Sequence, residues 1–134
     1  MSYAPIPRVV ANGRLTGQTA AVPSVTSFTV VASDASFLVS ANVNVTAGVA
    51  FVFTVRVTYT TEAGVVDTIH LGFWNTIAGA LSDSVDSGSG VGTFTGLGQR
   101  IRAKAGTTIT VSTVGLFTTV VYNIEAGIEQ VSAS

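Results

Sequence analysis

The stretch AFVFTVRVTYT, residues 50–60, has a large apolar side chain at every second position from Phe51 to Tyr59, and Thr54, Arg56 and Thr58 stand between the later ones. Its apolar positions are Phe51, Phe53, Val55, Val57 and Tyr59. Because successive side chains of a β-strand point to opposite faces of a sheet, a period of two predicts a strand with one buried face. An amphipathic helix would repeat every three or four residues, and this stretch does not.

The same period recurs outward from this stretch, in SFLVSANVNVT (residues 36–46) and in TVVYNIEAGIEQ (residues 119–130). Glycine-containing turns separate the patterned segments, and residues 81–92 form a longer loop rich in Gly and Ser. About eight strands are predicted, at 25–31, 36–46, 50–60, 65–74, 91–97, 99–105, 107–114 and 119–131. The predicted core consists of Phe28, Phe51, Phe53, Val55, Val57, Tyr122, Ile124 and Ile128.

Strands with one apolar face must hide those faces against each other, so the fold class is all-β, an antiparallel two-sheet β-sandwich. A jelly roll and an immunoglobulin-like sandwich both fit. The immunoglobulin cysteine pair is missing, and the long middle loop and long last strand favour the jelly roll. Residues 1–24, which hold all three prolines and show no period, are predicted to be an extended N-terminal arm, and residues 25–134 the sandwich domain.

The composition limits the classes of function. Charged residues make up 10% of the 134 residues, against about 25% in an average soluble domain, and mean hydropathy is +0.57. Depletion of charge marks the centres of interfaces, so we expect a homodimer or homotrimer. A net charge of −1 argues against a nucleic-acid partner. No apolar segment suits a membrane span or a signal peptide, and there are no cysteines.

Residues that could carry chemistry are few. His70 is the sole histidine, and a metal site needs more ligands of its kind. Asp83 and Asp86 lack the spacing of a calcium loop. Glu125 and Glu129 would lie about 13 Å apart along a strand, too far for the usual two-carboxylate hydrolysis. GTFTGLG, residues 92–98, has neither the lysine nor the helix of a phosphate loop. The sequence therefore predicts no enzyme activity, no metal and no cofactor.

The stretch QRIRAKAGTTITVSTVG, residues 99–115, holds half of the positive charge. Arg100, Arg102 and Lys104 alternate with Ile101 and Ala103, so on a strand the three basic residues face away from the core. Two interpretations stay open. The basic residues protect an edge strand from unwanted pairing, or they contact acidic groups. The candidate acids are Glu125 and Glu129 of the same or a neighbouring chain, or an acidic surface on another protein.

Three strings resemble small virion proteins of tailed bacteriophages and prophages: GRLTGQTAAV (13–22), IRAKAGTTITVSTVG (101–115) and YNIEAGIEQV (122–131). The resemblance spans about residues 13 to 131. It implies a structural protein of the virion, made in the host cytoplasm. The expected role is a capsid decoration or cement protein that bridges copies of the major capsid protein.

The resemblance and the residue pattern together give a set of interface candidates. An arm that reaches a neighbouring subunit would order on binding. The candidates are Arg100, Arg102, Lys104, Glu125, Glu129, Pro5, Pro7 and Arg8. One alternative is a tail or fibre module that binds a host glycan through exposed loop aromatics, for which Trp74 and Phe94 are the candidates. Another is a carbohydrate-binding module of a bacterial enzyme.

Overall fold

Extended segments make up the secondary structure of the computed structural model, which describes residues 8–31, 33–48, 51–75, 86–88, 92–117 and 120–132. β-Branched residues dominate these segments, as suits a pleated surface. The nine strands in the described residues are β1 Arg8–Gln18, β2 Thr26–Thr29, β3 Ala35–Gly48, β4 Phe51–Thr60, β5 Val66–Asn75, β6 Asp86–Gly88, β7 Gly92–Ala103, β8 Thr108–Phe117 and β9 Val120–Ser132.

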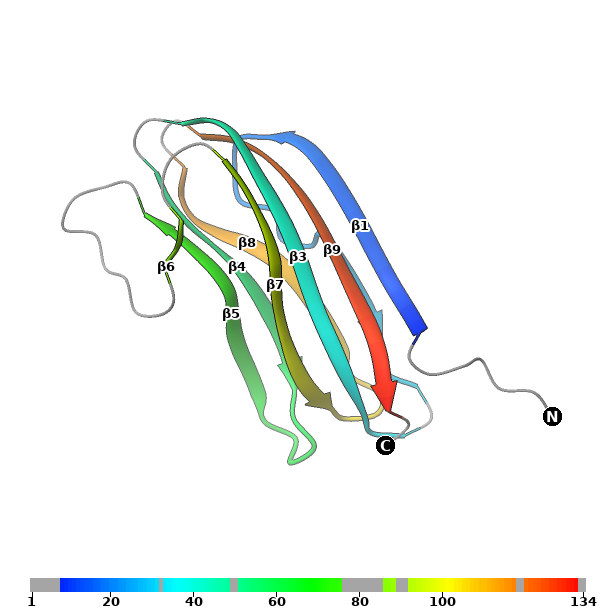
Figure 1. The fold of residues 1–134 in the computed structure, drawn as a ribbon. Helices are drawn as coiled ribbons and strands as arrows, with labels where there is room; N and C mark the ends of the chain where they lie inside the picture. Colours follow the sequence, from blue (N-terminus) through cyan, green and yellow to red (C-terminus); the bar gives the residue numbers. More distant parts are fainter. Residues whose placement is uncertain are drawn as a thin grey trace.

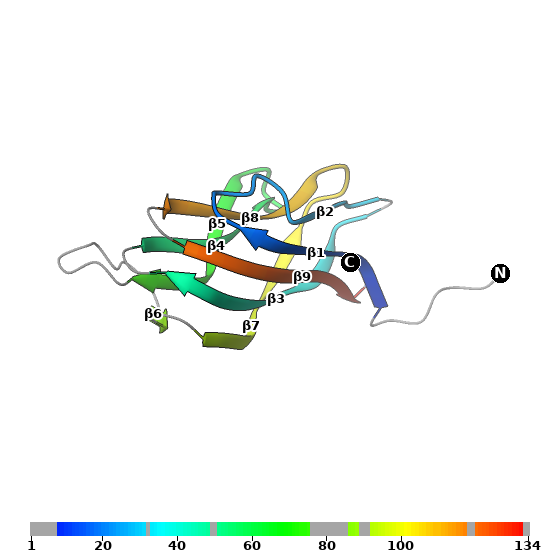
Figure 2. The same ribbon diagram turned by 90° about the horizontal axis from the view of Figure 1, so that it is seen from above.

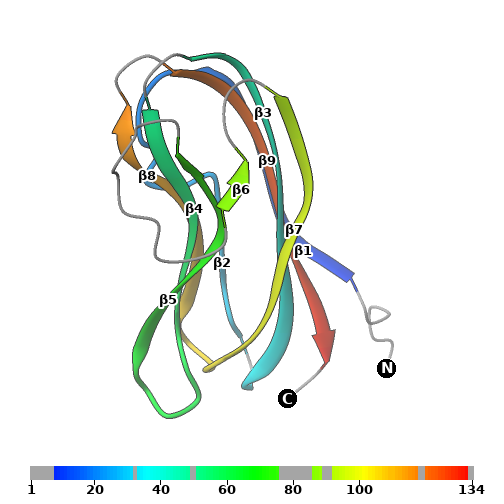
Figure 3. The same cartoon turned by 60° about the vertical axis from the view of Figure 1, so that its left-hand side comes forward.

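The strands form two sheets that face each other as layers (Figures 2 and 3). One sheet has the order β1-β9-β3-β7 and the other the order β2-β8-β4-β5-β6. Pairing is nested: β1 pairs with β9, β2 with β8, β3 with β7 and β4 with β5, all antiparallel. This nesting is the jelly-roll topology, so the predicted two-sheet sandwich is confirmed. The short strand β6, which runs parallel to β5, is an addition to the predicted set.

The core lies between the two layers and follows the period of two. Along β9 every second side chain is buried, from Val120 to Ile128, and β3 buries six alternate residues in the same way, from Ala35 to Val45. Of the predicted core, Val55, Val57, Tyr122, Ile124 and Ile128 are buried. Phe28 is partly buried against the core, with its ring centroid 5.8 Å from that of Phe37. The side chains of Phe51 and Phe53 lie outside the described part of the chain.

Two predicted boundaries are wrong in the middle of the chain. The segments 91–97 and 99–105 belong to one strand, β7, because Gly98 stays extended and pairs with Ser40 of β3. Within the predicted loop 81–92, residues 86–88 form β6. Asp83 and the side chain of Asp86 lie outside the described residues.

The N-terminal segment differs most from the prediction. Residues 8–18 are not an arm: they form β1, an edge strand of the four-stranded sheet paired with β9 (Figure 1). The register of this pairing shifts between Val9 and Ala11 and again between Leu15 and Gln18. Two shifts in one short strand break the period of two, which explains why the pattern failed to reveal it.

Of the three interface candidates in the N-terminal segment, the structure describes one, Arg8. Arg8 begins β1, and its Nη2 donates a hydrogen bond to Gln130 Oε1 at 3.3 Å in the same chain. Pro5 and Pro7 lie outside the described residues. The role of this segment in reaching a neighbouring subunit stays a prediction.

A buried hydroxyl pair holds the connection between β1 and β2 onto the sandwich. The hydroxyl of Tyr122 lies 2.7 Å from Thr113 Oγ1 and donates to the carbonyl oxygen of Ala20 at 2.7 Å. Thr113 Oγ1 accepts the backbone N–H of Val22 at 2.9 Å. Burial raises the pKa of the Tyr122 phenol, an effect that the hydrogen bond with Thr113 opposes. The connection is therefore fixed to both sheets by groups that have no access to water.

Candidate interaction surface

Three turns meet at one end of the sandwich: the β2–β3 turn, the β4–β5 hairpin and the β7–β8 turn (Figures 1 and 3). Backbone hydrogen bonds join them. Val30 N–H donates to the Thr107 carbonyl at 2.8 Å, Gly106 N–H to the Val30 carbonyl at 2.7 Å, and Lys104 N–H to the Thr60 carbonyl at 3.0 Å. Gly106 has a φ of 82°, which a residue with a side chain rarely adopts. The three turns thus form one connected end of the molecule.

This end exposes apolar side chains. Val31, Val65 and Val66 are 65%, 60% and 67% exposed, although valine is among the residues most often buried. Val65 and Val66 lie at the hairpin and Val31 at the β2–β3 turn. We call these valines, together with Arg100, Arg102 and Lys104, the tip surface.

The basic residues of the tip surface lie on the face that the sequence predicts. Arg100, Arg102 and Lys104 are exposed, whereas Ile101 and Ala103 between them are buried. β7 is an edge strand of its sheet. The face assignment is therefore confirmed, and the contact of these residues with another chain stays a prediction.

Arg102 already has partners in its own chain. Its guanidinium forms an ion pair with Glu62 of the β4–β5 hairpin and donates to Ser36 Oγ at 3.1 Å. A bridge between Thr61 and Ala103 brings the hairpin, which belongs to the other sheet, to the end of β7. Arg102 therefore connects the two sheets. Arg100 has no side-chain hydrogen bond or ion pair to a described residue.

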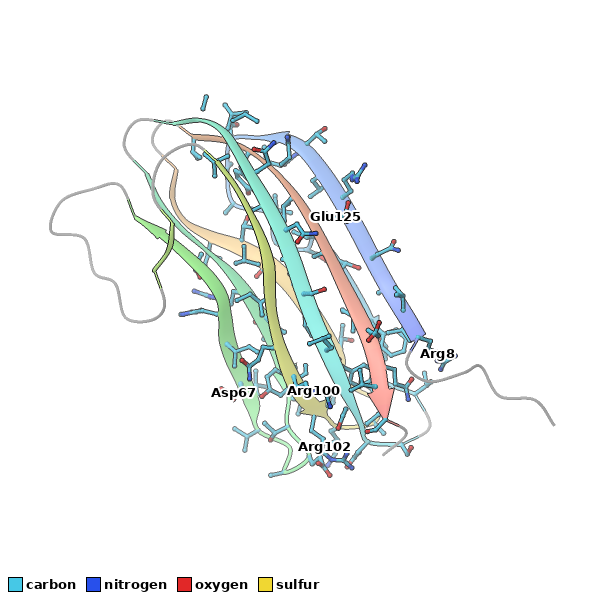
Figure 4. The ribbon with its side chains drawn as sticks, in the orientation of Figure 1. Arg8, Asp67, Arg100, Arg102 and Glu125 are labelled. Atoms are coloured by element: carbon cyan, nitrogen blue, oxygen red, sulfur yellow. The ribbon has the colours of Figure 1, made fainter. Side chains whose placement is uncertain are left out.

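The two acids predicted to receive the basic residues do not do so within the chain. Two guanidinium nitrogens of Arg14 in β1 donate to Glu125 Oε2, Nη2 at 2.6 Å and Nε at 2.9 Å. Glu129 lies opposite Leu38, which in turn lies opposite Arg100, so a whole strand separates the two charges. Figure 4 shows Glu125 and Arg102 toward opposite ends of the sheet. The sequence prediction missed Arg14 because it assigned that residue to an arm.

A groove runs between β7 and the β4–β5 hairpin next to the tip surface. It measures about 530 Å³ and is lined by Ser36, Tyr59, Thr61, Glu62, Ala63, Arg100, Ile101 and Arg102. The Tyr59 hydroxyl donates to Asp67 Oδ2 at 3.4 Å. Burial raises the pKa of Tyr59, and the negative charge of Asp67 adds to this effect. Tyr59 is therefore a neutral hydrogen-bonding group at neutral pH.

The other residues that the sequence singled out are His70, Trp74 and Phe94. His70 lies exposed on β5, opposite Arg56 of β4. Trp74 and Phe94 belong to β5 and β7 rather than to loops, and their side chains lie outside the described residues. The described residues contain no group of three or more His, Cys, Asp or Glu placed to hold a metal ion. Nor do they contain a helix with the length and apolar character that crossing a membrane requires.

Comparison with known proteins finds no related sequence and only solved structures of low similarity. No protein-family model matches the chain, and no curated protein matches it. Two solved structures, of the Gx and Gt strains of infectious bursal disease virus, are similar at TM-scores of 0.30 and 0.31 and sequence identities of 11% and 13%. The similarity covers 99% and 96% of this chain but 43% of each viral chain. At these scores the likeness assigns neither a family nor a function.

Proposed function

We propose that the protein is a structural component of a bacteriophage virion that decorates the capsid and docks through its tip surface. The observation that carries this proposal is the tip itself, which combines three exposed valines with exposed basic residues. Single exposed apolar residues are ordinary, but apolar groups gathered at one end and bordered by charge are typical of interaction sites. The resemblance of three sequence strings to virion proteins supports the same role.

Docking of this kind is non-enzymatic and works through binding energy. The valines supply apolar area, and Arg100 and Lys104 favour an acidic partner such as a capsid subunit. Because backbone hydrogen bonds join the three turns, little conformational freedom is lost when the tip binds. A copy bound across two capsid subunits would resist their separation.

Cryo-electron microscopy of virions that carry this protein tests the proposed place. Density for the sandwich on the capsid shell, with the three turns against capsid subunits, is the expected result. Density confined to the tail would contradict it and would favour the alternative of a tail or fibre module.

Rebinding to particles depleted of the protein tests the tip surface. The variants Val66→Asp and Arg100→Glu should each bind more weakly, and neither side chain belongs to the core. Thr16→Asp is the matched control, because Thr16 is exposed on β1 in the part of the strand far from the tip. Equal binding by all three variants would reject the tip surface as the docking site.

A further inference from the structure

A hollow opens on the outer face of the four-stranded sheet, across β1, β9 and β3, and none of its lining residues belongs to the tip surface. It measures about 460 Å³, within the size range of ligand pockets. Gly127 of β9 lies opposite Asn12 of β1 and Ser40 of β3. Because Gly127 has no side chain, the backbone of β9 forms the floor. The lining residues are Val9, Asn12, Gly13, Arg14, Ser40, Ala41, Asn42, Glu125, Ala126 and Gly127.

A second hollow continues the first along β9. It measures about 230 Å³, shares Arg14, Asn42 and Glu125 with the first, and adds the polar side chains of Thr16, Asn44 and Asn123. Asn123 is held in place, because its Oδ1 accepts the backbone N–H of Gly17 at 2.8 Å. The two hollows together form an elongated groove, which we call the sheet groove.

The sheet groove presents many hydrogen-bonding groups and no net charge. The single Arg14–Glu125 ion pair lies between the two hollows and cancels its own charge. Nε and Nη2 of Arg14 both donate to Oε2, and no described residue donates to the other carboxylate oxygen, Oε1. The carboxylate is thus fixed in orientation and keeps acceptor capacity. Amide and hydroxyl side chains supply both donors and acceptors around it.

We propose that the sheet groove binds a linear oligosaccharide. A sugar offers closely spaced hydroxyl groups that both donate and accept, and these match a fixed carboxylate, a guanidinium and side-chain amides. The backbone floor at Gly127 lets a sugar ring lie close to the sheet. A phosphate or nucleic-acid ligand would need an excess of positive charge, which the ion pair removes. The elongated shape favours several linked sugar units over one.

Titration of the isotopically labelled full chain, followed by NMR amide shifts, tests this proposal without any virion. The probes are maltotriose, cellotriose, the trimer of N-acetylglucosamine and sialyllactose, together with a printed array of bacterial and animal glycans. At least one probe should shift the amides of Asn12, Ser40, Asn42 and Gly127. A shift centred on β5 around Trp74, or no binding to any probe or array glycan, would overturn the proposal.

Two paired variants separate the groove from the rest of the sheet. Gly127→Val fills the floor, where an added Cβ has 3.9 Å to its nearest atoms, so the fold has room for it. Gly98→Val is the control on the same face of the sheet but outside the groove, with an added Cβ 3.5 Å from its nearest atom. Gly127→Val should weaken binding at least about tenfold, because a displaced sugar loses several hydrogen bonds.

Asn12→Ala serves as a second variant that leaves the floor unchanged. It should weaken binding of the same sugar without changing the amide spectrum elsewhere. Full affinity in both Gly127→Val and Asn12→Ala, or equal loss in Gly98→Val, would show that the sugar does not occupy this groove.

Discussion

At Gly13 the backbone of β1 passes so close to the β1–β2 connection that no side chain fits. A Cβ built on Gly13 would overlap the carbonyl oxygen of Val25, which is a backbone atom and cannot rotate away. We therefore expect Gly13→Ala to lower the free energy of unfolding by about 1–3 kcal/mol, the usual cost of overpacking. Chemical denaturation measures this difference.

Gly98→Ala is the control for Gly13→Ala. Its added Cβ meets only ordinary contacts, the nearest at 3.5 Å, and Gly98 also lies inside a strand. Replacing a strand glycine without a clash favours folding. The free energy of unfolding of Gly98→Ala should therefore be unchanged or raised by up to about 1 kcal/mol. If Gly13→Ala is as stable as Gly98→Ala, β1 does not approach Val25 as the structure has it.

Tyr122 couples stability to alkaline pH. Burial raises its pKa above the ordinary value of 10.0, and the hydrogen bond with Thr113 lowers it by less. The folded state therefore keeps the phenol proton to a higher pH than the unfolded chain does. This contribution to stability is fully present below 10.0, the ordinary value, and is lost as pH rises through the pKa of the folded state.

Denaturation midpoints from neutral to strongly alkaline pH test this dependence. In Tyr122→Phe the midpoint should fall less steeply at alkaline pH. The raised pKa of Tyr59 leaves a residual slope of the same sign. At neutral pH, Tyr122→Phe should be less stable by about 1–3 kcal/mol, because Ala20 and Thr113 lose a buried partner. An unchanged alkaline slope in Tyr122→Phe would show that Tyr122 is not the group responsible.

At the scale of elements, removal of β1 tests whether residues 8–18 are a structural strand of the sandwich. Val10, Ala11 and Leu15 pack against the core from this strand. Deleting residues 1–18 should therefore cost several kcal/mol, at about 1–2 kcal/mol for each partly buried apolar side chain, and should expose an edge of β9. Deleting residues 1–7 leaves every β1–β9 pair in place and should have little effect. Thermal unfolding of the two truncations decides between a strand and a dispensable arm.

The sequence predicts most of the sandwich because the long strands other than β1 keep an alternation of apolar residues, as in β3 and β9. It fails where the backbone departs from that alternation. β1 was missed because two register shifts hide its pattern, and β7 was predicted as two strands, although Gly98 between them stays extended and pairs with Ser40. The partners of Arg102 and Glu125 were missed for a related reason: each comes from an element that only the sheet topology brings near.

The Arg102–Glu62 pair is the contact by which Arg102 joins β7 to the β4–β5 hairpin within the chain. Both side chains are exposed, at 41% and 43%, so the pair should contribute no more than about 1 kcal/mol. Arg102→Glu should be slightly destabilised by repulsion from Glu62, and the charge exchange Arg102→Glu with Glu62→Arg should restore most of the loss. A double-mutant cycle by denaturation measures the coupling. Zero coupling would show that the two sheets do not need this contact.

At the scale of the whole molecule, uncharged polar groups cover much of the surface. On the five-stranded sheet, Ser27, Thr110, Thr58 and Thr68 form one row across four strands, and Thr29 and Thr108 share a hydrogen bond at 3.0 Å. Such a surface loses less solvation energy on contact than a charged one does. This property suits a protein that packs against many neighbours, as the proposed role on a capsid requires.

From the same composition we expect the purified protein to be a homodimer or homotrimer. With 10% charged residues there is little repulsion between copies, and Val31, Val65 and Val66 provide apolar contact area. Analytical ultracentrifugation at micromolar concentration should give a mass that is a multiple of 13.6 kDa.

The dependence on salt separates apolar from charged contacts. Because apolar contacts are not screened by salt, the association between copies should persist as ionic strength rises, whereas binding of an acidic partner through Arg100 and Lys104 should weaken. A single species of 13.6 kDa at all salt concentrations would contradict the prediction. Dissociation of Val66→Asp, with Thr16→Asp unchanged, would place the contact between copies at the tip surface.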